Sequence, residues 1–161
     1  MTDLLKSLKI VTDKIIEFLE NINDEQSLRK KPADDWNILE CMEHVFITEK
    51  GIYKLLNRPE LFGEAPSTKH DKLEEYNTGK FKAADYTLPA GRFSSVNELI
   101  EAFKILRKQM EEYIINELPK AGNETYPHPI LGPITKTQWI EFAIEHSQRH
   151  LIQMVKCEFE F

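Results

Sequence analysis

The chain has 161 residues, of which 41% are hydrophobic and 30% charged, proportions typical of one folded domain with a buried core. Its formal net charge of −6 and its lack of a lysine and arginine cluster argue against nucleic acid as a partner. No stretch approaches the ~20 apolar residues of a membrane span, and the first residues lack a signal-peptide pattern. Cys41 and Cys157 do not suggest a disulfide framework, so we expect a cytoplasmic protein.

Four segments have the apolar periodicity of amphipathic helices. The first covers about 3–22, and the second about 35–57, where Asp34 or Asp35 can serve as the N-cap. The third covers about 95–118, with Ser95 as N-cap and Glu98 completing a capping box. The fourth covers about 135–157. Four helices of this length predict an all-α fold, a four-helix bundle formed by the single domain 1–161.

Two connections are long enough to matter for function. The 58–94 stretch is rich in Pro, Gly, Lys and Asp, includes a candidate helical turn at 71–76, and would let helices two and three run parallel. The 120–134 stretch is stiffened by prolines just before the last helix. We expect either connection to supply a lid over a pocket at the end of the bundle.

His146 and His150 are spaced four residues apart in the last predicted helix. Residues with this spacing lie on the same helical face, here the apolar face, so both imidazoles are predicted to point into the bundle. Buried imidazoles need partners, which could be tyrosines or carboxylates of the core. A metal ion would satisfy both at once.

His44 lies at the margin of the apolar stripe of the second helix. Three histidines on two helices that face one interior suit a divalent transition metal and leave coordination positions open for water or substrate. The two other histidines fall in loops. We expect His70 to be solvated and His128, between two prolines, to overhang a pocket.

The segment from Trp36 to Val45, with His44 near its end, resembles the DinB-like superfamily motif of a Trp followed by a ligand histidine. The stretch from His128 through Trp139 to Gln153 is similar to the C-terminal motif of that superfamily. The resemblance spans essentially the whole chain. It implies a down-up-up-down four-helix bundle in which His44, His146 and His150 hold a divalent metal. Relatives include bacillithiol S-transferases, a mycothiol-dependent maleylpyruvate isomerase and proteins described as metal-dependent hydrolases.

Several other side chains are candidates for roles near the histidines. Cys41 is a possible fourth ligand, although the resembling family uses three histidines, and Cys157 is expected to pack in the core. Arg149 could bind a substrate carboxylate or, as we prefer, pair with an acid. Glu40, Glu43 and Glu145 could each orient an imidazole or lie on a solvated helix face. Gln153 is expected to line the pocket. Trp36 and Trp139 are expected to anchor helix ends.

These observations predict a metal-dependent enzyme that acts on a small-molecule substrate. A divalent Zn, Ni or Fe ion could activate water for hydrolysis or bind a low-molecular-weight thiol for S-transfer. The resemblance slightly favours S-transfer. The alternative is a non-catalytic, metal-stabilised or ligand-binding helical module, with a homodimer as one option.

Overall fold

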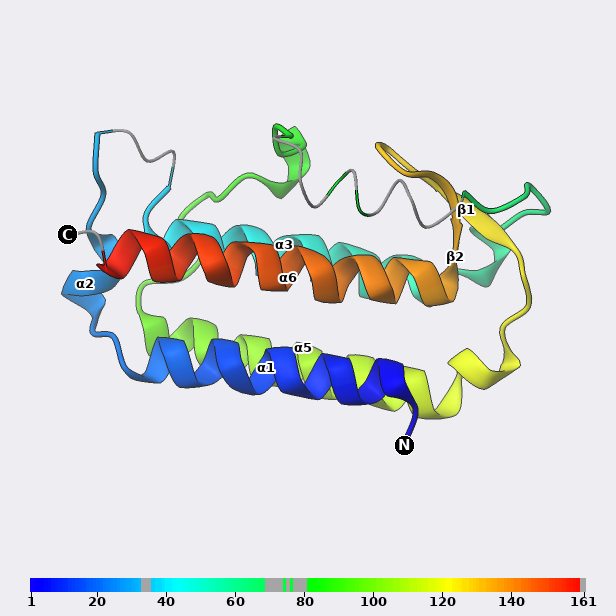
Figure 1. Cartoon of the computed structure of the whole chain (residues 1–161), viewed down its shortest axis with the longest axis horizontal. Coiled ribbons are helices and arrows are strands. Elements are labelled where there is room, and N and C mark those ends of the chain that lie inside the picture. Colours follow the sequence, from blue (N-terminus) through cyan, green and yellow to red (C-terminus); the bar gives the residue numbers. More distant parts are fainter. Residues whose placement is uncertain (33–35, 69–73, 75, 77–80, 160–161) are drawn as a thin grey trace.

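Four long helices make up most of the computed structural model, which describes residues 1–32, 36–68, 74, 76 and 81–159 (Figure 1). Each corresponds to one of the four predicted segments, with its ends displaced by no more than three residues. The chain is therefore mostly helical, as predicted. The four helices are α1 (Asp3–Glu20), α3 (Ile38–Leu56), α5 (Val96–Asn116) and α6 (Lys136–Phe159).

The start of α3 differs from the prediction. Asn37 is its N-cap: the Asn37 side chain accepts from the backbone N–H of Glu40 at 2.8 Å, and the Glu40 carboxylate accepts from the N–H of Asn37 at 2.9 Å. This reciprocal pair satisfies two N–H groups that the first turn leaves unpaired. The predicted caps, Asp34 and Asp35, lie outside the described residues.

The capping box predicted for α5 forms only in part. The Ser95 hydroxyl accepts from the N–H of Glu98 at 3.2 Å, as expected. The Glu98 carboxylate, however, bonds the N–H and the hydroxyl of Ser94 rather than the N–H of Ser95. A complete reciprocal pair occurs instead before α6, between Thr135 and Gln138.

The long helices pack around a shared apolar core. Helix α3 lies against α6, and α1 lies against α5 and α6. In Figure 1, α3 and α5 run in one direction and α1 and α6 in the other. The largest fully buried apolar side chains come from all four helices (Leu8, Ile15, Leu19, Ile38, Met42, Leu56, Leu99, Phe103, Met110, Ile140 and Met154). No described helix is both long and apolar enough to cross a membrane.

A short helix that was not predicted, α2 (Asp24–Leu28), follows α1. Its first residue, Asp24, accepts from the backbone N–H of Val96 at 2.9 Å and so helps to cap α5. Gln26 of α2 donates to the carboxylate of Glu158 near the end of α6, at 2.9 Å. The connections also contain three 3₁₀ turns, at Pro59–Leu61, Asp85–Thr87 and Leu118–Lys120.

The all-α prediction was incomplete, because the segment before α6 forms an antiparallel hairpin of β1 (Thr125–His128) and β2 (Gly132–Thr135). Its prolines were interpreted only as stiffening residues. Pro127 and Pro133 face each other across the ribbon, and the Pro133 carbonyl points outward to the N–H of Thr68 at 2.8 Å. Opposite residues in such a ribbon alternate between exchanging hydrogen bonds and exchanging none. The two prolines occupy a non-hydrogen-bonded pair, where their lack of an N–H removes no hydrogen bond between the strands.

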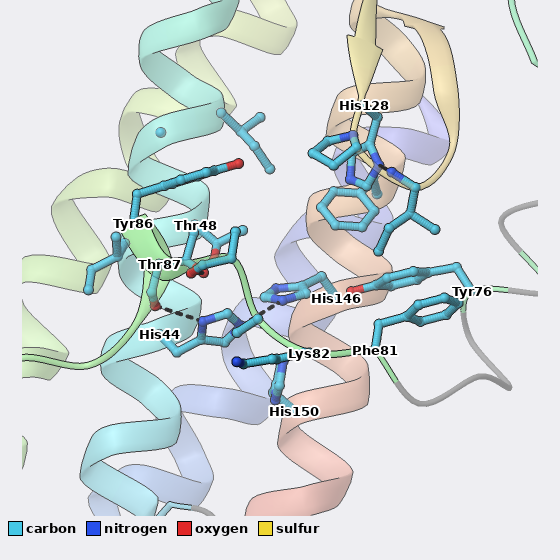
Figure 2. A pocket seen from close by; sticks show the side chains of 18 of the residues that line it. His44, Thr48, Tyr76, Phe81, Lys82, Tyr86, Thr87, His128, His146 and His150 are labelled. Carbon is cyan, nitrogen blue, oxygen red and sulfur yellow. Dashed lines mark hydrogen bonds between the residues drawn. The ribbon is translucent and has the colours of Figure 1, made fainter.

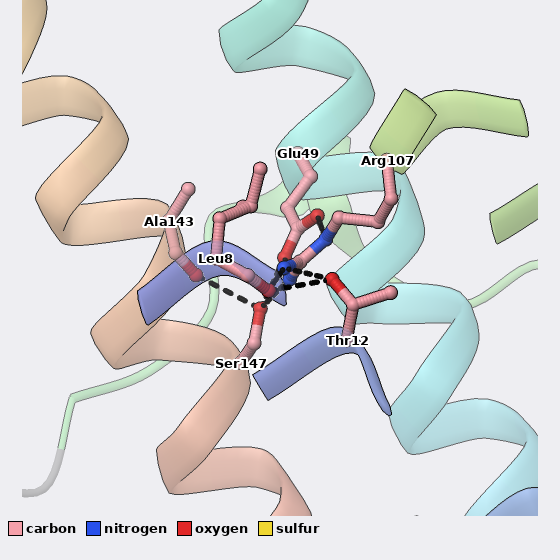
Figure 3. Close-up of polar contacts among 6 residues, drawn as sticks. All are labelled: Leu8, Thr12, Glu49, Arg107, Ala143 and Ser147. Carbon is pink, nitrogen blue, oxygen red and sulfur yellow. Dashed lines mark hydrogen bonds and ion pairs between the residues drawn. The ribbon is translucent and has the colours of Figure 1, made fainter. Parts of the chain in front are cut away.

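A polar network crosses the middle of the core (Figure 3). The guanidinium of Arg107 on α5 forms an ion pair with Glu49 on α3, at 2.8 Å and 2.6 Å, and the two side chains are 1% and 0% exposed. Arg107 also donates to Thr12 of α1 at 3.0 Å and to Ser147 of α6 at 2.6 Å. The Ser147 hydroxyl in turn donates to Glu49. One network therefore joins all four long helices.

Candidate metal centre

His44 of α3 and His146 and His150 of α6 meet in the interior (Figure 2). The Nε2 atoms of His44 and His146 are 3.0 Å apart. The ring of His150 lies 4.9 Å from that of His44 and 4.5 Å from that of His146, between centroids. All three side chains are buried, with exposures of 5%, 3% and 9%. We call these three residues the histidine cluster.

Two imidazole rings of the histidine cluster are fixed by hydrogen bonds at Nδ1. Nδ1 of His44 lies 2.9 Å from the backbone carbonyl oxygen of Thr87. A carbonyl only accepts, so Nδ1 carries the proton and Nε2 keeps its lone pair. Nδ1 of His150 lies 2.9 Å from Oε1 of Gln153, which has the same effect. Partners that fix the tautomer in this way are typical of metal-ligating histidines.

Burial keeps the histidine cluster uncharged. Desolvation lowers the pKa of His146 well below its ordinary value, and the neighbouring His150 and His44 lower it further. Burial likewise lowers the pKa of His150 to about 4. Burial also lowers the pKa of His44, although the hydrogen bond to Thr87 raises it in part. The imidazoles are therefore neutral at pH 7, which is the form that binds metals.

The closest two donors, on His44 and His146, have the separation that a shared divalent transition metal requires, and all three ligand atoms lie within 4.8 Å of one another. Two nitrogens that are each ~2.0–2.1 Å from one ion lie about 2.9 Å apart at a right angle and about 3.3 Å apart at a tetrahedral angle. The observed Nε2–Nε2 distance of 3.0 Å falls in this range. Nδ1 of His146 is buried and has no hydrogen-bond partner among the described residues. An all-imidazole set of this kind could hold a divalent metal ion.

Cys41 does not belong to the group of ligand atoms in the described structure. Its Sγ lies 3.5 Å from Nδ1 of His150, the same nitrogen that faces Gln153. Desolvation by burial raises the pKa of the Cys41 thiol, so the thiolate that a metal requires is disfavoured. Cys157 is buried, as expected for a packing residue.

The histidine cluster opens into a cavity of about 1050 Å³. The described walls come from α3, from α6, from the tip of the hairpin and from residues 81–88, which we call the 81–88 segment. Both long connections therefore contribute to the walls. Seven aromatic side chains line the cavity (Trp36, Tyr76, Phe81, Tyr86, Tyr126, Trp139 and Phe142).

His128 lines the cavity without joining the histidine cluster. Its Nδ1 accepts from the backbone N–H groups of Ile130 and Leu131, both at 3.1 Å. Burial lowers the pKa of His128 to about 4. The ring is therefore neutral at pH 7, with its proton on Nε2. His70, expected to be solvated, lies outside the described residues.

The glutamates considered as imidazole partners have other roles where their contacts are described. Glu40 caps α3. Glu43 is 2% exposed and accepts from the backbone N–H groups of Ala90, Gly91 and Arg92 at 3.0–3.2 Å and from the Arg92 guanidinium at 3.0 Å. Burial alone would raise the pKa of Glu43, but these hydrogen bonds hold it below its ordinary value.

The remaining candidates lie at or beside the cavity. Arg149 donates to the backbone carbonyl of Tyr76 at 2.7 Å, and its guanidinium lies 5.3 Å from the centre of that ring. Trp36 lines the cavity and contacts His44, with ring centroids 4.8 Å apart. Trp139 packs against His128 at 5.0 Å. Each tryptophan therefore touches a histidine as well as standing near a helix start.

Comparisons with known proteins place the molecule among related sequences. The profile of the DinB superfamily matches residues 7–154. The uncharacterised protein YuaE of Bacillus subtilis (strain 168) is 28% identical over 140 residues, which cover 84% of this chain and 85% of YuaE.

Proposed function

The chain belongs to the DinB superfamily, and from this premise we propose that it is a metal-dependent enzyme acting on small molecules, with His44, His146 and His150 as the metal ligands. One observation carries the proposal: three neutral imidazoles, two of them oriented by hydrogen bonds at Nδ1, converge at the wall of a cavity of about 1050 Å³. A purely structural site would be closed on all sides, whereas an open face beside the ligands leaves room for a reactant.

We assign the molecule to a single four-helix bundle domain in down-up-up-down order. The shared core and the run directions of the four long helices in Figure 1 support this assignment. In such a bundle the ligands come from α3 and α6, which pack directly against each other. Rigid helices can hold catalytic side chains more precisely than loops can.

Transfer of a low-molecular-weight thiol is the reaction that we favour. A bound divalent cation would supply Lewis acidity, which lowers the pKa of a thiol or a water that binds it. Hydrolysis gains from a general base that takes a proton from water. The described cavity walls contain no carboxylate, and Nδ1 of His128 is already occupied by two N–H donors. A thiol ionises more readily than water, so S-transfer depends less on such a base.

The residues around the histidine cluster have separable tasks. Thr87 and Gln153 keep the lone pairs of His44 and His150 on Nε2. The buried aromatic walls, such as Trp139 and Phe142 at 6% and 4% exposure, would keep water from part of the reacting region. Nε2 of His128 holds a proton that can be donated in a hydrogen bond to a polar atom of the reactant.

Metal analysis tests the ligand assignment. We expect wild-type protein to bind one divalent ion per chain, and His44→Ala, His146→Ala and His150→Ala each to lose it. Gln148→Ala, an exposed change on α6 between two of the ligands, is the matched control and should keep the ion. Retention of a full equivalent in all three histidine variants would refute the assignment.

Chelation and a reactivity screen test the function. Removal of a catalytic ion from a preformed bundle should leave helicity nearly unchanged and abolish thiol transfer to a generic electrophile such as 1-chloro-2,4-dinitrobenzene. The screen compares several low-molecular-weight thiols, with His150→Ala as the inactive reference. Collapse of the fold on chelation, together with no reaction by any thiol, would favour the non-catalytic, metal-stabilised module instead.

A further inference from the structure

The described lining of the cavity beside the histidine cluster contains no acidic residue. Acidic residues make up 27 of the 161 residues of the chain, yet none occurs among the 26 described residues that line the cavity. Two cationic side chains, Lys82 and Arg149, are among them. The described lining therefore differs in charge from this acidic protein as a whole, whose formal net charge is −6.

Lys82 is placed to contact a ligand. It belongs to the 81–88 segment, which contributes Thr87 to the support of His44. Figure 2 shows its side chain extending into the cavity near the histidine cluster. Among the described residues its ammonium has no hydrogen bond or ion pair, whereas Lys104 and Lys120 are paired with glutamates. The Lys82 charge is therefore available to a guest.

Aromatic surface lines the same cavity. Phe81 stacks on Tyr76, with centroids 5.3 Å apart and planes at 11°, and Tyr76 meets Phe142 edge-on at 5.2 Å. All three rings line the cavity. Phe81 directly precedes Lys82, and Figure 2 shows the two side chains extending in different directions, Phe81 toward Tyr76 and Lys82 toward the histidine cluster. A ligand that contacts both must therefore extend across part of the cavity. Such walls favour a ligand with an aromatic body and one anionic group.

We propose that the cavity takes a small aromatic carboxylate as a reactant, and that Lys82 determines this specificity by binding the carboxylate. The inference rests on the proposed function, since it names the substrate class of the same site. A single ammonium suits one carboxylate better than a phosphate group, which proteins usually bind with several backbone N–H groups or an arginine fork. The described walls offer no glycine-rich loop for that purpose.

Calorimetric titration with a matched pair of probes tests the proposal. Phenylacetate and its neutral isostere phenylacetamide have the same aromatic body and differ in charge, and neither contains a thiol. Each is titrated at low salt into wild type, Lys82→Met, Lys82→Arg and Lys54→Met. Lys54 is exposed on α3 and lies outside the described cavity walls, so its variant is the matched control for loss of one positive charge.

We expect wild type to bind phenylacetate about tenfold or more tightly than phenylacetamide. Lys82→Met should abolish most of that preference, and Lys82→Arg and Lys54→Met should retain it. Equal affinity for the two probes, or no detectable binding of either, would contradict the proposal. An undiminished preference in Lys82→Met would also contradict it, because the carboxylate would then be bound by other groups.

The metal content of each variant separates this proposal from the proposed function. Lys82 is not a ligand, so Lys82→Met should keep a full equivalent of metal. Loss of the carboxylate preference with the metal retained supports the role of Lys82. A wild-type protein that binds metal but does not prefer the carboxylate refutes the specificity and leaves the metal assignment standing. A protein that prefers the carboxylate but binds no metal refutes only the proposed function.

Discussion

Replacing Arg107 by Met would remove the cation at the centre of the buried network. The change leaves the Glu49 carboxylate, which is 0% exposed, without its ion-pair partner. It also deprives the Thr12 and Ser147 hydroxyls of a donor. Methionine fills much of the same volume, so the loss is electrostatic rather than a large cavity.

The expected magnitude follows from the burial of the pair. Breaking a fully buried ion pair by removing one partner costs about 3–5 kcal/mol, because the remaining charge is uncompensated. The free energy of unfolding of a single domain is about 5–15 kcal/mol. Arg107→Met should therefore remove a large share of the stability at pH 7. Converting Glu49 to Leu as well should restore most of it, because the apolar pair leaves no buried charge.

Urea unfolding followed by circular dichroism measures these differences. With a slope of about 2 kcal/mol/M, the midpoint of Arg107→Met should fall by about 2 M. Lys108→Met, an exposed change on the same helix, should shift it by less than ~0.3 M. A loss below ~1 kcal/mol in Arg107→Met, or a double variant no more stable than the single one, would refute the reasoning.

Three further predictions concern contacts around the histidine cluster. Gln153→Leu removes the acceptor of His150 and should weaken metal affinity about 10–100-fold in competition with a chelator, whereas unchanged affinity would exclude this role. Glu43→Gln should lower the free energy of unfolding by about 1–3 kcal/mol at pH 7. Because the folded-state pKa of Glu43 is depressed, wild type loses this advantage as the pH falls below about 4.5, and a difference that grew on acidification would contradict the assignment. Cys41 should react with a thiol reagent only after unfolding, because burial raises its pKa; fast labelling of the native protein would contradict this.

The long helices were predictable because their sequence patterns are local. Spacings of three and four residues predicted α1, α3, α5 and α6 to within three residues at each end. The hairpin was missed because prolines usually interrupt strands. Its register, which sets the two prolines opposite each other, depends on a pairing that no single segment reveals.

The histidine cluster was predictable in part. The four-residue spacing of His146 and His150 indicated a shared face, and His44 was included because of its helix and the family motif. The structure brings the three together, while the metal itself remains a prediction. The supporting contacts were not predictable, because they join distant residues. Thr87 lies 43 positions from His44, and Arg107 lies 58 positions from Glu49.

The position of Thr87 links two properties of the molecule. The 81–88 segment forms one wall of the cavity and also carries the carbonyl that fixes His44. An outward movement of this segment would also withdraw that carbonyl and break one buried hydrogen bond, at a cost of about 0.5–1.5 kcal/mol. While the 81–88 segment is displaced, the imidazole of His44 would be free to rotate or to change its tautomer. In the proposed enzyme, entry of a small molecule past this segment would thereby be coupled to the orientation of His44 through a single peptide group.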